Sequence, residues 1–460
     1  MKNSQDGIWI GGKDLNRDPE FIQEAQKEMH DTSLLQTVGN EKIANEVEGS
    51  RRDFLKYLGF GLGAATVAAS CDIPVKRAIP YVVKPDEIIP GVATYYASTY
   101  VKGGEYCPVL VKTREGRPIK IEGNGSSPIT GGGTSARAQA SVLDLYDVNR
   151  LRGPQVADGD GFNTTSWDDL FSSLGSSLGS GARIRILSNT ILSPSFKSVI
   201  SDFTAKYPNT KLVQYDPVSA SALLDANQKT FGQRVVPDYK FDKADYIVSF
   251  NADFLGTWIS PIEYSRGYAA KRKIKSVKGA SMSRHVQVES HMSLTGSNAD
   301  HRILVKPTEQ SSAVAFLYNQ VLGGSIGTSG LTDKAKKALQ STAQQLIAHR
   351  GHSIVVSGNN NLGEQLLVNA INNHLGNYGN TISFAHASLQ RQGSDSDMAS
   401  LVAEMNAGRV DALIINDANP VYDYFNGAAF ATGMAKVGSK IAMAYRHDET
   451  TALCQSLIHI

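Results

Sequence analysis

The chain has 460 residues, which allows two or three domains of roughly 100–200 residues each. Apolar residues make up 41% and charged residues 20%, values that are ordinary for a soluble globular protein. The 46 basic and 44 acidic residues give a formal net charge of +2, and no basic block stands out. Nucleic-acid binding has no electrostatic support, so we expect no nucleic-acid partner.

The first 71 residues predict a targeting segment. Residues 1–49 form a polar leader extension, and residues 50–56 have the pattern of a twin-arginine export signal. The uncharged stretch 57–70 that follows reaches about 21 Å as a helix, short of the ~30 Å hydrocarbon core, so a signal fits better than a permanent span. The export-signal residues are Arg51, Arg52, Phe54, Leu55 and Lys56.

Cys71 directly follows this signal. Small residues precede it, Ala68, Ala69 and Ser70, as at a lipoprotein cleavage site. An uncleaved signal or ordinary cleavage is the alternative to lipidation. One acyl chain binds a membrane only weakly, so stable attachment through Cys71 needs a second contact.

Residues 72–155 predict a small β-rich region. Alternating apolar residues indicate a hairpin over 109–123, with its turn at Glu115-Gly116. A loop rich in Gly, Ser and Pro follows over 123–133, and a helix is expected over 136–146.

Residues 156–460 predict an α/β region. Ser166 is a candidate N-cap, followed by acidic residues that favour a helix start. Strands and helices then alternate, and this rhythm favours a doubly wound parallel sheet. The expected strands are 184–187, 211–215, 246–250, 354–356 and 412–415, and the expected helices are 196–207, 219–231 and 365–374.

Three side chains of one segment suggest a metal site, but weakly. His285, Glu289 and His291 share parity and would face one side of a strand. Their extended spacing would place neighbouring ligands about 7 Å apart, so one ion would not reach all three without a bend. Solvated or hydrogen-bonded histidines are the favoured interpretation.

Two loops after predicted strands are candidate ligand sites. One loop consists of Ser357, Gly358 and Asn359 and precedes a predicted helix. Backbone N–H groups at the start of a helix are able to hold phosphate, but the pattern lacks the lysine of a P-loop. Asn419 and Pro420 follow the strand 412–415, where α/β folds commonly bind ligands. A tight turn is the alternative in both cases. No catalytic motif accompanies them.

The order of these signals resembles one family, the molybdopterin oxidoreductase large subunit. It resembles in particular the extended twin-arginine variety that forms the iron–sulfur/molybdopterin-like subunit of alternative complex III, here its N-terminal portion. The segments that carry the resemblance are Trp9 with 18–21, the hairpin 109–123, residues 145–151 with Pro154, residues 166–169 and 251–255, Glu289, residues 295–296 and 299–300, Arg302, and residues 418–420.

The resemblance implies an α/β fold with doubly wound, mostly parallel sheets behind a small β-hairpin region. Active members carry several cysteines near the first hairpin, which bind a [4Fe–4S] cluster. Here residues 93–100 contain none and only Cys107 remains, and one thiolate does not hold a cluster. The resemblance therefore implies no cofactor in this segment. Ser357, Gly358, Asn359, Asn419 and Pro420 would be remnants of a pterin cleft.

The family continues beyond the position of Ile460, so we expect the α/β region to be incomplete at its C-terminus, with iron–sulfur clusters only in the missing part. The expected function is a non-catalytic structural portion of a quinol-oxidising respiratory complex on the periplasmic side of the cytoplasmic membrane. Its partners would be cytochrome and integral membrane subunits. The alternatives are an active polysulfide- or thiosulfate-reductase-type molybdopterin enzyme, and a stand-alone exported lipoprotein that binds a small ligand.

Overall fold

A computed structural model describes residue 89 and residues 91–459, apart from residues 160, 180, 275, 277, 279 and 280. The leader, the twin-arginine signal and Cys71 lie outside the described residues. The chain divides into two units, Met1–Lys84 and Pro85–Ile460, and every element below belongs to the second. Within the residues that the structure describes, no helix has the length and apolar character needed to cross a membrane.

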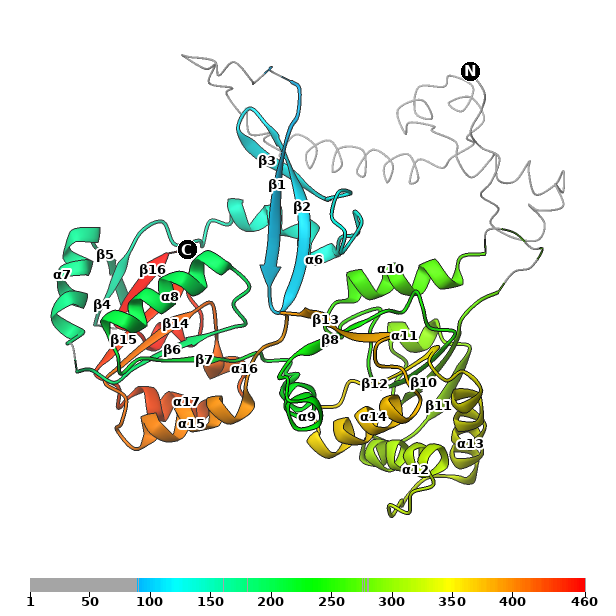
Figure 1. The fold of residues 1–460 in the computed structure, drawn as a ribbon. Coiled ribbons are helices and arrows are strands. Elements are labelled where there is room, and N and C mark those ends of the chain that lie inside the picture. Colours follow the sequence, from blue (N-terminus) through cyan, green and yellow to red (C-terminus); the bar gives the residue numbers. More distant parts are fainter. Residues whose placement is uncertain are drawn as a thin grey trace, which may run out of the picture. The chain divides into compact units, whose positions relative to one another are not determined.

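The first described elements form a three-stranded antiparallel sheet, drawn in blue in Figure 1: β1 (Thr94–Lys102), β2 (Glu105–Arg114) and β3 (Arg117–Gly123). The predicted hairpin is β2–β3. Its turn at Glu115-Gly116 has positive φ at both residues, as two-residue hairpins favour. The predicted helix after it begins as α6 (Ala136–Ala140) and tightens into the 3₁₀ helix η1 (Ser141–Tyr146).

The first α/β part contains a seven-stranded sheet in the order β5-β4-β16-β15-β14-β6-β7. The five strands from β16 to β7 are parallel, and β4 and β5 extend the sheet antiparallel. The strands are β4 (Gln155–Asp158), β5 (Gly161–Thr164), β6 (Ile184–Ser188), β7 (Lys211–Gln214), β14 (Ala412–Asn416), β15 (Ser439–Ala444) and β16 (Ser456–His459). The helices are α7 (Trp167–Ser177), α8 (Pro194–Lys206), α15 (Asp395–Asn406), α16 (Pro420–Asp423) and α17 (Gly427–Met434), with the 3₁₀ helix η3 (Thr451–Leu453).

Helices cover both faces of this sheet. On one face, Leu413 and Ile415 of β14 pack against Met398 of α15 and Phe430 of α17. On the other face, Ile186 of β6 belongs to a separate cluster with residues of α8. All five residues of β6 are buried, which explains why this strand is a continuous run rather than an alternating one.

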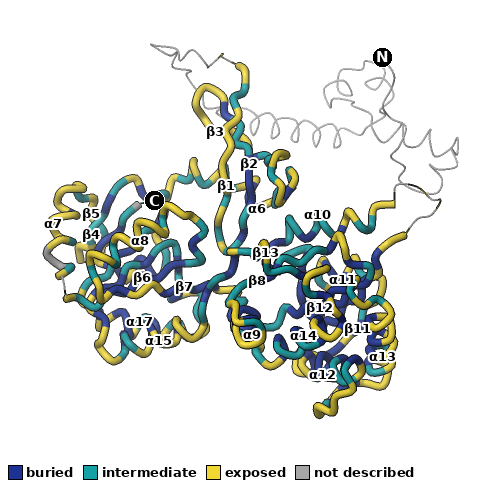
Figure 2. The backbone as a smooth tube through the Cα atoms, in the orientation of Figure 1, coloured by how far each residue is buried: buried dark blue, intermediate teal, exposed yellow. Residues whose placement is uncertain are grey.

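The second α/β part contains a four-stranded parallel sheet in the order β11-β10-β9-β12. The strands are β9 (Tyr246–Phe250), β10 (Arg284–Glu289), β11 (His301–Leu304) and β12 (Ser353–Ser357). Helices α12 (Gln310–Leu322), α13 (Asp333–Ala348) and α14 (Leu362–His374) share one apolar cluster with the sheet, and α9 (Ser221–Phe231) and α10 (Pro261–Arg272) share another. Figure 2 shows buried residues concentrated along the strands and exposed residues on the outer helix faces. Two short helices complete the part, α11 (Leu294–Ser297) and η2 (Pro307–Glu309).

The chain passes between the two α/β parts twice. It leaves the first after β7 through residues 215–220, and it returns through residues 389–394 after the antiparallel pair β8 (Val236–Tyr239) and β13 (Ile382–Ser388). Buried Asp216 joins the two crossing segments, because its Oδ2 accepts hydrogen bonds from Gly393 N at 2.8 Å and Thr190 Oγ1 at 2.6 Å.

The predicted fold class is confirmed, but the strand assignment within it needs a correction. The alternating rhythm of residues 184–250 suggested one continuous sheet. The structure places β6 and β7 in the seven-stranded sheet and β9 in the four-stranded one. β6 pairs with β7 on one side and with β14 on the other, where Ala412 lies opposite Ile184. Local alternation predicts that strands exist, whereas pairing depends on contacts between residues far apart in the chain.

Candidate functional site

Each parallel sheet has a point where the order of its strands reverses. In the seven-stranded sheet it lies between β6 and β14, and in the four-stranded sheet between β9 and β12. Ligands of open α/β sheets bind beyond the carboxyl ends of strands at such points. Ser357, Gly358 and Asn359 lie at one of them and Asn419 with Pro420 at the other, so the predicted residues line two different cavities.

The Ser357–Asn359 turn uses its polar groups internally. Glu364, buried at the start of α14, accepts hydrogen bonds from the Ser357 hydroxyl and from Asn359 Nδ2, the latter at 3.0 Å. Asn359 N donates to Ser357 Oγ at 3.1 Å, and Asn361 caps the helix by accepting from Glu364 N at 3.1 Å. A phosphate at this turn would meet the Glu364 carboxylate rather than free N–H groups.

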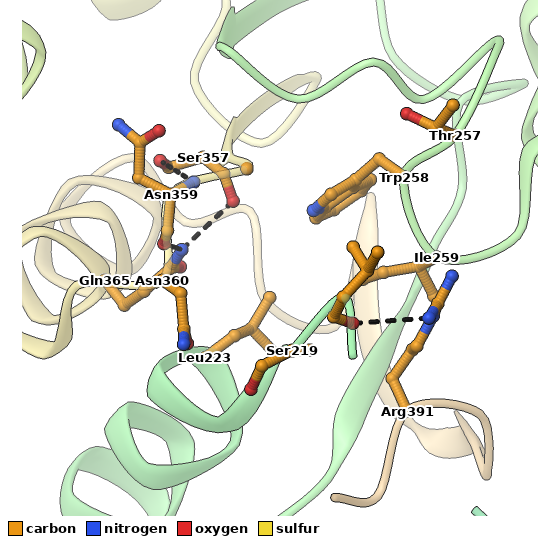
Figure 3. Close-up of a pocket in the computed structure, with 13 residues that line it drawn as sticks. Ser219, Leu223, Thr257, Trp258, Ile259, Ser357, Asn359, Asn360, Gln365 and Arg391 are labelled. Atoms are coloured by element: carbon orange, nitrogen blue, oxygen red, sulfur yellow. Dashed lines mark hydrogen bonds between the residues drawn. The ribbon is translucent and has the colours of Figure 1, made fainter. Parts of the chain in front are cut away.

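The cavity beside this turn is small. Figure 3 shows Trp258 and Ile259 on the side opposite Ser357 and Asn359. The cavity volume is about 40 Å³. Pockets for small molecules and cofactors usually measure about 300–1,000 Å³. Buried Arg391 also lines the cavity, but it donates a hydrogen bond to Val218 O at 3.2 Å. The tight-turn interpretation describes this segment better than a ligand cradle.

At the other edge, Asn419 also has a structural role. Its Nδ2 donates to Glu449 Oε2 at 2.7 Å, and its Oδ1 accepts from Thr450 N and from the Thr450 hydroxyl. Pro420 is the first residue of α16, where its fixed φ suits a helix start. Asn419 therefore fastens the 448–451 loop to the end of β14.

The cavity at this second edge measures about 260 Å³ and has mixed charge. Lys102 of the β1–β2 turn lines it, with its Nζ 2.7 Å from the Tyr445 hydroxyl and 4.1 Å from the centre of the Tyr445 ring. Asp417 and Asp448 also line the cavity. Burial raises the pKa of Asp417, so this carboxyl is poorly solvated.

A third cavity, which sequence reasoning did not predict, lies where the first crossing segment meets α15 and residues 423–425. It measures about 320 Å³, and we call it the acidic–aromatic pocket. Among the described residues, no lysine, arginine or histidine lines it. The lining residues are Tyr215, Asp216, Pro217, Ser219, Asn360, Asp395, Ala399, Asp423, Tyr424 and Phe425. The available sequence signal was the run Tyr422-Asp423-Tyr424-Phe425, which places aromatic residues around an acid in a loop.

Burial is the main cause of the pKa shifts in the acidic–aromatic pocket, and neighbouring carboxylates add to them. Burial raises the pKa of Asp423 to about 6, and the Asp448 carboxylate adds to the rise. Burial also raises the pKa of the Tyr215 hydroxyl well above its usual value, with further contributions from Asp423 and Asp395. The pKa of Tyr424 is raised by burial and by Asp395. The pocket therefore favours a positively charged occupant.

Replacing Asp423 by asparagine is expected to stabilise the free chain at neutral pH. A carboxyl whose folded pKa is raised costs stability above pH 6 and costs nothing below its usual pKa near 4. After discounting for partial exposure, we expect a gain of about 1 kcal/mol at pH 7.5. Urea unfolding at pH 7.5 and pH 4 measures it. Asp397→Asn on the same α15 as Asp395 is the control, and an equal gain there would contradict the assignment to the pocket.

The described residues offer no ligand set for the iron–sulfur cluster of active molybdopterin oxidoreductases. Cys107 and Cys454 are buried thiols, and burial raises the pKa of each, that of Cys454 to about 12. Among the residues that the structure describes, no three His, Cys, Asp or Glu side chains form a group that could hold a metal ion, and a [4Fe–4S] cluster needs about four ligands. For the pterin, the cavity at Ser357 is too small, whereas the cavity at Asn419 is lined by Lys102 and Arg446 as well as by carboxylates.

His285 and Glu289 lie on the same face of β10, as their parity predicted, whereas His291 is exposed beyond the end of the strand. Gln287 lies between the two buried side chains and contacts His285 Nε2 and Glu289 Oε2, each at 3.2 Å. Tyr268 OH contacts the other ring nitrogen of His285 at 3.2 Å. The row is therefore a buried hydrogen-bonded network.

This network predicts loss of stability in acid. Burial lowers the pKa of His285 from 6.5 to about 4, and the Arg272 charge adds to the shift. The folded state therefore binds fewer protons than the unfolded state between these values, and stability falls as the pH falls through them. We expect His285 to contribute a loss of about 2 kcal/mol between pH 7.5 and pH 5.

Urea unfolding of the wild type and of His285→Gln at both pH values measures this loss. The variant should show a smaller difference between pH 7.5 and pH 5, by about 2 kcal/mol. His374→Gln, at the last residue of α14, is the control for replacing a histidine elsewhere. Equal pH dependence of the wild type and His285→Gln would show that His285 is not buried in its neutral form.

Known proteins resemble this chain in sequence and in fold. No family model matches the chain. It is 24% identical over 412 residues to "Menaquinone reductase, molybdopterin-binding-like subunit" from Nitratidesulfovibrio vulgaris strain Hildenborough, covering 79% of this chain and 58% of that protein. The chain thus spans less than two thirds of the length of this relative.

Among solved structures, acetylene hydratase from Pelobacter acetylenicus matches with a TM-score of 0.57 and 9% identity, over 76% of this chain and 61% of that chain. The formyltransferase/hydrolase complex of Methylorubrum extorquens reaches a TM-score of 0.45 at 13% identity, over 67% of this chain and 86% of that chain. The first likeness concerns the fold alone. The chain therefore has the α/β fold of the molybdopterin oxidoreductases and is a distant homologue of a molybdopterin-binding-like subunit.

Proposed function

We propose that the chain is a non-catalytic structural subunit of a membrane-associated, quinol-oxidising respiratory complex of the alternative complex III type. The observation that carries the proposal is the combination of a molybdopterin-oxidoreductase fold with described residues that form no metal-ligand group and leave only a small cavity at Ser357. The relative in Nitratidesulfovibrio vulgaris is named as a subunit of a menaquinone reductase and as molybdopterin-binding-like, which supports a role inside such a complex.

The internal use of polar groups supports a structural role. Glu364 and Asn361 satisfy the Ser357–Asn359 turn, and Asn419 fastens the 448–451 loop. A side chain whose hydrogen bonds are already made within its own fold has little left for a substrate. We propose that electrons pass through centres carried by other parts of the complex, and that its partners are cytochrome and integral membrane subunits.

The test is to purify the full chain with its complex from the membranes of its source. We expect cytochrome and membrane subunits to co-purify in a constant ratio, with quinol oxidation by the whole complex. Molybdenum and tungsten should be far below one atom per chain, with a known molybdopterin enzyme analysed in parallel as the positive control. Stoichiometric molybdenum or tungsten would establish the enzyme alternative, and a monomer without partners would establish the stand-alone lipoprotein.

We also propose export through the twin-arginine route and attachment to the periplasmic side of the membrane. Arg51→Lys with Arg52→Lys is expected to leave the chain in the cytoplasm, because the export route reads the arginine pair. Protease accessibility in spheroplasts measures this, and Lys76→Arg, a conservative change of another basic residue outside the pair, is the control. Cys71→Ser should remove a lipid mass from the N-terminal peptide. Unchanged export of the double variant would contradict the signal.

A further inference from the structure

The acidic–aromatic pocket has no role in the function proposed above, and its composition is unusual for the interior edge of a fold. Its volume of about 320 Å³ exceeds that of the cavity beside Ser357, about 40 Å³. Carboxylates and aromatic rings dominate its lining, to which no described basic residue contributes. Asp395 is exposed, but Asp423 is half-buried, and a half-buried carboxylate without a cation is costly, so its position needs an explanation.

The three carboxylates of the pocket differ in how well they are satisfied. Asp216 is 2% exposed and fully bonded, because its two oxygens accept from Thr190 and from Gly393 N, and the Arg391 charge also acts on it. Asp395 accepts from Asn360 Nδ2 at 2.7 Å. Asp423 has a buried Oδ1 without a hydrogen-bond partner among the described residues. The carboxylate oxygens that remain able to accept further hydrogen bonds in the pocket thus belong to Asp395 and Asp423.

Aromatic rings surround these two carboxylates. The rings of Tyr215 and Tyr424 meet edge to face with their centres 5.8 Å apart, and the ring centre of Phe425 lies 4.6 Å from that of Tyr424. Phe425 is 90% exposed, and Tyr422 in the preceding α16 is 75% exposed. An aromatic face next to a carboxylate is a favourable site for a guanidinium or ammonium group, which gains both a charge-assisted hydrogen bond and a cation–π contact.

We propose that the acidic–aromatic pocket is a docking site for an arginine or lysine side chain carried by a partner subunit of the complex. Asp395 and Asp423 accept its hydrogen bonds, and Tyr424 and Phe425 cover its aliphatic stem. The charge complementarity between two free carboxylates and a basic group identifies the chemistry of the occupant. This proposal rests on the proposed function as a subunit.

A protein segment fits the surroundings better than a free small cation. The nearly complete exposure of Phe425 and Tyr422 leaves apolar rings in water beside the pocket. Interfaces between proteins are enriched in aromatic residues and arginine, which cluster where water is excluded. A partner that buries these rings around a basic anchor would use both features, whereas a small cation would cover only the carboxylates.

The experiment uses the complex purified through a tag on the full chain. We compare the double variant Asp395→Asn/Asp423→Asn, the variant Phe425→Ala and the control Asp397→Asn, which removes one negative charge from the first turn of α15 outside the pocket lining. The two pocket variants should weaken the retention of one partner subunit about tenfold or more in salt-titrated washes. The control should retain the subunit as the wild type does, and circular dichroism checks that each variant is folded.

A photo-crosslinking residue identifies the occupant. p-Benzoylphenylalanine in place of Phe425 should crosslink to a peptide of another subunit that contains arginine or lysine, and the same residue in place of Phe171 on α7 should not yield this product. Retention unchanged in both pocket variants, or crosslinks at 425 only to lipid or to a second copy of this chain, would overturn the docking site. If no subunit co-purifies even with the wild type, the proposed function itself fails, which is a distinguishable result.

Discussion

Replacing Gly358 by alanine is expected to destabilise the protein by about 4 kcal/mol. A Cβ atom at this position would lie 2.4 Å from the backbone oxygen of Asn251 and 2.8 Å from Cα of Ala252. Both neighbours are backbone atoms at the end of β9, and Gly358 N donates to Phe250 O at 2.9 Å. The clash is therefore relieved only by separating β12 from β9 at their carboxyl ends.

Urea unfolding measures this loss, and a matched glycine provides the control. Gly363 lies five residues further on, in the first turn of α14, where a Cβ would only approach Asn361 Oδ1 at an ordinary 3.4 Å. Gly363→Ala should be neutral or stabilising by up to about 1 kcal/mol, because alanine favours helices. If Gly358→Ala unfolds at the wild-type midpoint, the close approach of the two strand ends does not exist and the glycine is free for another role.

Replacing Arg302 by methionine is expected to cost about 3 kcal/mol, the second large effect. Arg302 Nε lies 2.7 Å from Oε1 of Glu289, which is fully buried at the end of β10. Ser293 Oγ and Gln287 Nε2 also donate to this carboxylate, but they carry no positive charge. Removing the only cation in contact with it among the described residues leaves a buried negative charge, which is costly when its partner is lost.

A second substitution tests the cause of this effect. In the double variant Arg302→Met/Glu289→Gln, the buried charge is also gone, and most of the lost stability should return. Arg183→Met is the surface control, because the Arg183–Asp411 pair is about half exposed and exposed ion pairs contribute little to stability. Equal losses in the single and double variants would show that the packing of the arginine stem, rather than the charge, is what matters.

The candidate site was predicted from the sequence only in part. The placement of Ser357 and Asn419 after strands was correct, because a buried apolar run followed by small polar residues marks a strand end. Whether such a loop binds anything depends on groups far away in the chain. Glu364 and Glu449 occupy the donors of these loops, and Trp258 narrows the cavity at the first. The acidic–aromatic pocket joins residues from 215 to 425 and has no contiguous motif.

Local sequence was sufficient for the individual elements. The β2–β3 turn at Glu115-Gly116, the Ser166 cap of α7 and the continuous apolar strands follow from interactions between residues close in the chain. The tertiary structure decided that β6 pairs with β14 and β9 with β12. It also decided that the polar groups of the candidate loops are already hydrogen-bonded, and that no described cation lines the pocket of Asp395 and Asp423. These outcomes depend on long-range packing, which local periodicity and capping do not encode.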